Sequence, residues 1–155
     1  MNRKLYAATA LALPVAAAGI VAAGAASHPG GHDRGVIELT TKRIHRNVID
    51  HGTPGFSEDD VIVFSNDLYR GNQKVGEDGG SCTVTRIADD GSVTAHCLGT
   101  NSLPGGQLST QGLAPGSGPF ELAITGGTGR YGHAHGQVFG KETSPTEMSI
   151  RIVLK

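Results

Sequence analysis

Short strand-like runs, separated by turn-forming residues, recur along the chain from residue 36 to residue 154. In the last of them, every second residue from Met148 onward is apolar, and this period of two predicts a strand with one buried face. Eight runs have a strand-like character: Val36–Ile44, Val61–Tyr69, Ser81–Ala88, Ser92–Thr100, Gln107–Leu113, Pro119–Thr125, His135–Glu142 and Glu147–Leu154. No segment among them shows a ten-residue helical stripe, and residues 47–60 are expected to form a loop. Short strands at this spacing predict an all-β sandwich or barrel.

The N-terminal segment has a different pattern. Two basic residues precede an uncharged, Ala-rich stretch, Leu5–Ala26, which ends in small residues. This order is typical of a secretory signal peptide that is cleaved, although the stretch is also long enough to form an uncleaved membrane anchor. We expect residues 1–26 to form a signal helix, residues 27–35 a flexible tail, and residues 36–155 one β-domain. The mature domain is then secreted and has no membrane partner.

The two cysteines lie on neighbouring runs. An Asp-Asp-Gly turn at residues 89–91 predicts a tight hairpin between the third and fourth runs. Symmetric pairing about the first peptide bond of this turn places Val84 opposite Ala95, and Cys82 opposite Cys97. Directly opposed residues come close enough for a disulfide when the pair is not hydrogen-bonded. In an exported protein a disulfide is the expected state, with two buried thiols acting as small hydrophobes as the alternative.

Composition and charge exclude several classes of protein. The chain has 13 Lys and Arg residues against 14 Asp and Glu residues, so its formal net charge is −1. A nucleic-acid-binding domain would show a basic stripe, so we expect no nucleic-acid partner. Charged residues make up only 17% of the chain and apolar runs recur, which argues against a disordered chain.

Three local motifs suggest cofactors or metals, and each has a simpler explanation. Residues 127–132 match G-x-G-x-x-G, but no helix follows to bind a pyrophosphate, so a tight loop with positive φ angles is expected. His133 and His135 would share a strand face, yet no third metal ligand is identifiable. Cleavage after Ala25 would leave an N-terminus suited to copper(II) through His28, but the sequence does not fix the cleavage position. We therefore expect no cofactor and no metal site.

Four stretches together resemble a known family. They are VIVFSNDLY at residues 61–69 with KVG at 74–76, GSCTV at 80–84, GQLSTQG at 106–112, and LAITGGTGRY at 122–131. Their order and spacing resemble the allene oxide cyclase barrel-like proteins, which are related to plant dirigent proteins. The resemblance implies an eight-stranded antiparallel β-barrel with a pocket for a hydrophobic small molecule. It favours the barrel over the sandwich, and full closure also removes exposed sheet edges.

The resemblance also implies candidate site residues. The plant cyclase closes an unstable epoxide of an oxidised fatty acid, using a water held by Asn side chains, a nearby Glu, a Cys and aromatic walls. On that pattern Asn66 and Glu38 are candidate catalytic residues, since an amide can hold a water or a developing oxyanion. A structural role for Asn66 and a surface strand position for Glu38 are the alternatives. The candidate ligand-binding residues, which strand alternation turns inward, are Ile62, Phe64, Leu68, Cys82 and Val84.

The sequence departs from the plant cyclase in two ways. Thr40 occupies the position expected for the first-strand Asn, and a disulfide would leave Cys82 without its thiol. Three functions therefore remain as hypotheses: a secreted cyclase or isomerase acting on a hydrophobic substrate, a non-catalytic dirigent-type protein that binds or orients a ligand, and a structural domain with a filled core. Related barrels often form trimers, so a homo-oligomer is a further expectation.

Overall fold

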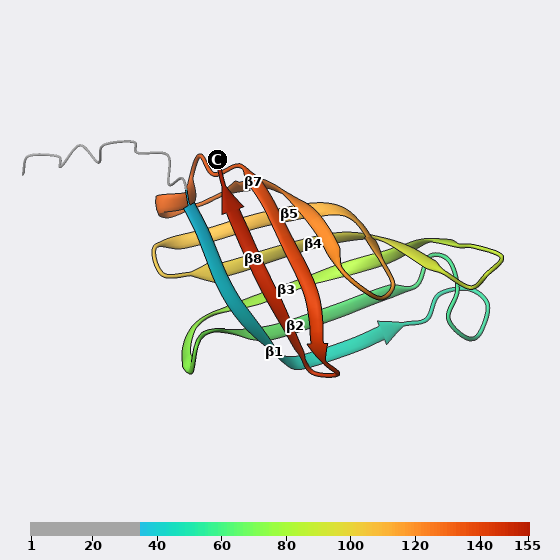
Figure 1. Ribbon diagram of the computed structural model, residues 1–155. Helices are drawn as coiled ribbons and strands as arrows, with labels where there is room; N and C mark the ends of the chain where they lie inside the picture. The colour runs from blue at the N-terminus through green and yellow to red at the C-terminus, as the bar shows by residue number, and fades with distance from the viewer. Residues whose placement is uncertain (1–34) are drawn as a thin grey trace, which may run out of the picture. The chain divides into compact units, whose positions relative to one another are not determined.

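The computed structural model describes residues 35–155, which form a closed barrel of eight antiparallel strands in chain order (Figure 1). The strands are β1 (Gly35–Ile49), β2 (Val61–Arg70), β3 (Gln73–Ile87), β4 (Val93–Leu103), β5 (Gly106–Pro115), β6 (Phe120–Gly127), β7 (Gly136–Ser144) and β8 (Glu147–Leu154). Pairing of β1 with β8 closes the barrel. The barrel expected from the resemblance is thus confirmed, and the sandwich is excluded. The predicted signal helix, at residues 1–26, lies outside the described residues.

All eight predicted runs are strands, but β1 and β3 are longer than expected. β1 continues to Ile49, and β3 begins at Gln73, eight residues before the predicted Ser81. The added part of β3 contains Gly76 and Gly80, at which a Cβ atom would lie 2.1 Å from a backbone carbonyl oxygen of β4. Glycine is required by this close approach of the two strands, although it also makes the segment resemble a loop in the sequence.

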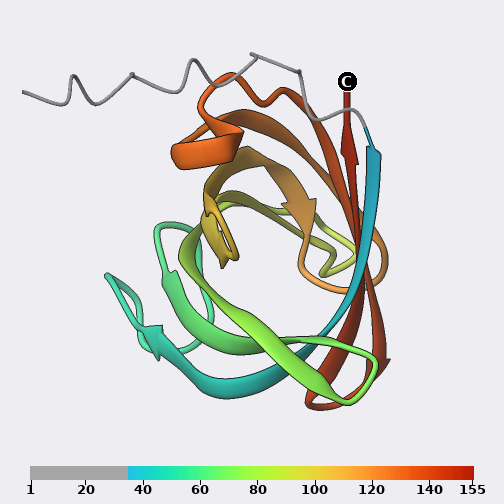
Figure 2. The ribbon, with the colours of Figure 1, turned by 90° about the vertical axis from the view of Figure 1, so that its left-hand side faces the viewer.

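One end of the barrel is filled by side chains. The described core cluster there consists of Leu39, Leu68, Leu103, Leu108, Ile124, Tyr131, Val138, Ile150, Ile152 and Leu154. Figure 2 shows the ring of strands with the short 3-10 helix η1 (Gly129–Tyr131), drawn in orange, at its rim. η1 lies at the same end as the β4–β5 turn, whereas the β1–β2 and β3–β4 connections lie at the opposite end (Figure 1). We call these the filled end and the open end.

The glycine motif at residues 127–132 closes the filled end. It forms the three-residue helix η1, and Tyr131 at its end is buried. Gly129 has a φ of +59°, as expected for a tight loop. The Arg130 amide donates a hydrogen bond of 2.8 Å to the Gly105 carbonyl oxygen and ties the motif to the β4–β5 turn. The motif therefore serves the fold, and it lacks the long helix that a dinucleotide site needs.

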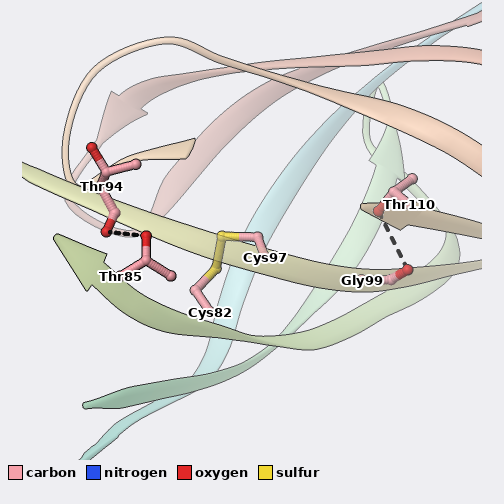
Figure 3. The surroundings of a disulfide bond; sticks show 6 residues. All are labelled: Cys82, Thr85, Thr94, Cys97, Gly99 and Thr110. Carbon is pink, nitrogen blue, oxygen red and sulfur yellow. Dashed lines mark hydrogen bonds between the residues drawn. A yellow bond between two sulfur atoms is a disulfide. The ribbon is translucent and has the colours of Figure 1, made fainter. Parts of the chain in front are cut away.

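The β3–β4 hairpin has the predicted register. Cys82 pairs with Cys97 and Val84 with Ala95, before a bulge at Thr85 shifts the pairing by one residue. Cys82 and Cys97 form a disulfide across the two strands (Figure 3). The predicted disulfide is confirmed, and the alternative of two free thiols is excluded.

Candidate functional site

The open half of the barrel contains a cavity of about 480 Å³. All the connections at the open end contribute to its mouth, including Phe56 of the β1–β2 loop and Thr146 of the β7–β8 turn. The volume falls within the range of about 300–1,000 Å³ that small-molecule pockets occupy. A second depression of about 320 Å³ is shallow, open and lined by Gly, Ser, Thr and one Leu, without a titratable side chain. The larger cavity is therefore the candidate site.

The walls of this cavity differ in chemistry. An apolar wall comes mainly from β4, β5 and β6, where Ala95, Ala114 and Leu122 pack with the Cys82–Cys97 disulfide. The facing strands β1, β2 and β3 supply the polar side chains Thr41, Arg43, Arg46, Asn66 and Asp78. The remaining polar lining comes from Glu142 of β7 and from the turns at the mouth. The cavity therefore has an apolar wall on one side and, on the other, polar groups together with Ile62 and Phe64 of β2.

Asn66 and Asp78 form the centre of the polar wall. They lie directly opposite each other on β2 and β3, and both line the cavity. The Asn66 Nδ2 donates a hydrogen bond to the Asp78 Oδ1. The Asn66 side chain thus binds an acid in the cavity wall rather than capping the end of a strand.

Burial in the barrel wall raises the pKa of Asp78 to about 6, and the hydrogen bond from Asn66 opposes this rise only partly. Removal from water disfavours the charged form of a carboxyl group, which explains the direction of the shift. A carboxyl with a pKa near neutrality can both donate and accept a proton under ordinary conditions, as an acid–base catalyst must.

The structure brings together four of the candidate catalytic and ligand-binding residues, along with Cys97 of the disulfide. Ile62, Phe64, Asn66 and Cys82 all line the cavity. Phe64 and Ile62 occupy successive inward positions of β2 toward the open end, in line with strand alternation. Their contact with a ligand remains a prediction.

Three other candidates lie away from the cavity lining. Leu68 is fully buried in the core of the filled end. Val84 is also fully buried, and its backbone pairs with Asp59 and Asp60 of the β1–β2 loop. Glu38 is exposed on β1, between the inward-facing Ile37 and Leu39 of the filled end. None of the three is among the residues that line the cavity.

Sequence reasoning missed Asp78, Arg43 and Arg46. Asp78 fell within the glycine-rich stretch before the predicted start of its strand. Even with β3 extended backward, symmetric pairing about the β2–β3 turn would have placed Glu77 opposite Asn66. A bulge at Val75 shifts the register by one residue and brings Asp78 to that position. Arg46 reaches the cavity because of a bulge at Ile44, which simple alternation does not reveal.

No group of three or more His, Cys, Asp or Glu side chains in residues 35–155 is arranged to hold a metal ion. In the same part of the chain, no helix is long and apolar enough to cross a membrane.

Comparison with known families and structures gives consistent matches. The model of the allene oxide cyclase barrel like domain matches residues 39–154. A solved structure of a pyocyanin demethylase is 31% identical, with a TM-score of 0.72, and the match covers 77% of this chain and 99% of that one. No curated protein sequence matches the chain significantly.

More distant structures share the fold. A Diels–Alderase from Streptomyces koyangensis is 17% identical, with a TM-score of 0.66, over 77% of this chain and 63% of that one. A pterocarpan synthase dirigent protein is also 17% identical, with a TM-score of 0.60, over 77% of this chain and 83% of that one. At these identities the likeness extends to the barrel alone.

Proposed function

The chain belongs to the allene oxide cyclase barrel-like family, and from this premise we propose that it binds a hydrophobic small molecule in the open half of its barrel and isomerises or cyclises it. The observation that carries the proposal is a buried acid, Asp78, in the wall of a cavity whose opposite wall is apolar. The similar solved structures include a demethylase, a Diels–Alderase and a dirigent protein, names that refer to small-molecule chemistry.

The apolar wall orients the ligand and excludes water. Orientation is itself a large contribution to the rate of an intramolecular reaction, because it fixes the reacting atoms near each other. Phe64 and the disulfide supply flat and polarisable surface for rings or conjugated chains. A cavity of about 480 Å³ also argues against a structural domain with a filled core.

Asp78 performs the proton transfer in this proposal. The neutral acid donates its proton to one carbon of a conjugated ligand, and the carboxylate then takes a proton from another carbon as the double bonds shift. One proton enters the ligand and one leaves, so the composition of the ligand is unchanged and no co-reactant is needed. The Asn66 amide holds the Asp78 carboxyl in place through its hydrogen bond.

A second candidate is a non-catalytic, dirigent-type protein that binds or orients its ligand. Two observations favour it over the chemistry of the plant cyclase: the disulfide leaves no thiol at Cys82, and Glu38 lies outside the cavity. The same disulfide supports a secreted protein, because disulfides persist mainly in oxidising compartments.

The test begins with native mass spectrometry of the protein isolated from the cells that produce it. A retained guest is extracted, identified and returned to ligand-free protein in deuterium oxide. Wild type is expected to convert the guest and to leave deuterium on carbon, whereas Asp78→Asn retains binding without conversion. A guest that binds without conversion by wild type favours the dirigent-type role. Equal conversion by both proteins would contradict the role of Asp78.

A further inference from the structure

The bulge in β1 places two arginines on the inner face of the barrel. Arg43 pairs with Asn66 and Arg46 pairs with Phe64, so that Ile44 is the extra residue. Without the bulge, an alternation that turns Thr41 and Arg43 inward would next turn His45 inward. The extra residue moves Arg46 into that position, and both Arg43 and Arg46 line the cavity.

Within residues 35–155, neither guanidinium group is neutralised by an acidic side chain. Among residues 35–155, neither Arg43 nor Arg46 forms an ion pair with Asp78 or Glu142, the two acids that line the same cavity. The Arg43 Nη1 donates a hydrogen bond of 2.7 Å to the Pro145 carbonyl oxygen, which fixes the side chain and leaves its other N–H groups available. Arg46 has no hydrogen-bond partner within the described residues.

Arg46 lies nearer the mouth than Asp78 does, whereas Arg43 lies at the level of Asp78. Arg43 is level with Asn66 in the strand register, and Arg46 lies further toward the open end, level with Phe64. Asp78 is at the Asn66 level on the next strand. A bound molecule therefore meets Arg46 at the entrance, and Arg43 and Asp78 further in, with apolar surface opposite.

We propose that the ligand joins an apolar ring or conjugated body to an anionic group, such as a carboxylate, which Arg46 binds at the mouth together with Arg43 below it. This inference rests on the proposed ligand-binding function and adds the chemical class of the ligand. A guanidinium presents parallel N–H groups that match the two oxygens of a carboxylate. The anionic end fixes which part of the apolar body reaches Asp78.

Glu142 also lines the mouth and is exposed. Its negative charge opposes the binding of an anion, and no ion pair with an arginine is formed within residues 35–155. Neutralising Glu142 should thus strengthen the binding of an anionic ligand, whereas neutralising Arg46 should weaken it. Two substitutions with opposite expected effects give a sharper test than either one alone.

The test uses two fluorescent probes that share one skeleton. N-phenyl-1-naphthylamine is neutral, and 1-anilinonaphthalene-8-sulfonate carries an added sulfonate. Both are titrated into wild type, Arg46→Gln, Glu142→Gln and the control Arg151→Gln, whose side chain is exposed on β8 and does not line the cavity. Thermal unfolding of each variant confirms that it is folded.

Arg46→Gln is expected to weaken binding of the sulfonate probe by about threefold to tenfold. This range reflects a partly solvent-exposed ion pair between the Arg46 guanidinium and the sulfonate. Glu142→Gln is expected to strengthen it by about twofold, and Arg151→Gln to leave it unchanged. The neutral probe should bind all four proteins within twofold of one another. Added salt should weaken only the sulfonate probe.

The outcomes separate the two proposals. If the neutral probe binds but the sulfonate adds no affinity, or if Arg46→Gln weakens both probes equally, the anionic ligand class is wrong and the proposed function stands. If neither probe binds wild type, both proposals fail.

Discussion

The amide of Asn66 donates a hydrogen bond to the carboxyl of Asp78, and the two residues lie directly opposite each other on β2 and β3. Both side chains line the cavity of the open half. This pair contains the one described carboxyl of the cavity wall whose pKa is raised by burial, and the consequences for stability can be measured without a ligand.

Replacing Asp78 should change stability in a pH-dependent way. The pKa of Asp78 in the folded protein is raised from 3.8 to about 6 by burial, so the folded state carries the cost of a buried charge above about pH 6 and none below about pH 4. Asp78→Asn removes that cost and should raise the free energy of unfolding by about 1–2 kcal/mol at pH 7.5. At pH 4 the variant and wild type should be nearly equal.

Thermal unfolding followed by circular dichroism at both pH values checks this prediction. Asp67→Asn is a suitable control, because Asp67 lies next to Asn66 and forms an ion pair with Lys74 outside the cavity. A stability difference between wild type and Asp78→Asn that does not vary with pH would contradict the raised pKa.

The disulfide should contribute measurably to stability. It joins residues 15 apart in the sequence, and closing a loop of that length stabilises a folded protein by about 3 kcal/mol in the chain-entropy model. The double variant Cys82→Ala/Cys97→Ala should therefore unfold at a lower urea concentration than wild type. Its free energy of unfolding should be lower by about 2–3 kcal/mol. An unchanged midpoint would show that the hairpin turn and the strand pairing alone fix this part of the barrel.

The two halves of the barrel should respond differently to truncation. Leu68 is fully buried in the filled end, so Leu68→Ala should cost about 2–5 kcal/mol of stability. Ile62 lies on the same strand but borders the existing cavity, so its side chain has fewer packed neighbours to lose. Ile62→Ala should therefore lower the free energy of unfolding by less than Leu68→Ala does. Urea unfolding of both variants compares the two positions, and equal losses would mean that the open half is packed as tightly as the filled one.

The loop between β1 and β2 is organised by Asp60. Its carboxylate accepts hydrogen bonds of 2.8 Å from the backbone amides of His51 and Ser57, which hold the pKa of Asp60 below its usual value. Phe56, which lines the mouth, is carried by this loop. Asp60→Asn should speed hydrogen exchange at the His51 and Ser57 amides. Amide exchange measured by NMR tests this, with the amides of β8 as an internal reference that should not change.

Much of the fold was predictable because the turn residues and the strand alternation in the sequence agree with the strand pairing in the barrel. The β3–β4 turn fixed the register in which Cys82 faces Cys97, and alternation along β2 placed Ile62, Phe64 and Asn66 on one face, all of which line the cavity. The division into a filled and an open half was not predictable, because it depends on which inward side chains from eight strands meet at the same level. Leu68 and Ile62 look alike in the sequence, yet only Ile62 borders the cavity.

The candidate site was only partly predictable for a related reason. Glycines in a strand reduce its local β propensity, and the requirement for Gly76 and Gly80 arises from contacts with β4 that are distant in sequence. For this reason the sequence did not place Asp78 on a strand or in the site. A bulge likewise depends on the partner strand, so the inward position of Arg46 could not be read from β1 alone.

The central claim is that the open half of the barrel accepts an apolar small molecule, and titration with the neutral probe N-phenyl-1-naphthylamine tests it most directly. Three proteins are compared: wild type, Ala114→Phe, which fills the cavity from β5, and Leu113→Phe, which adds a ring on the outer face of the same strand. We predict one probe bound per wild-type chain, at least tenfold weaker binding to Ala114→Phe, and unchanged binding to Leu113→Phe, with all three proteins folded. No binding to wild type, or equal binding to wild type and Ala114→Phe, would contradict the claim.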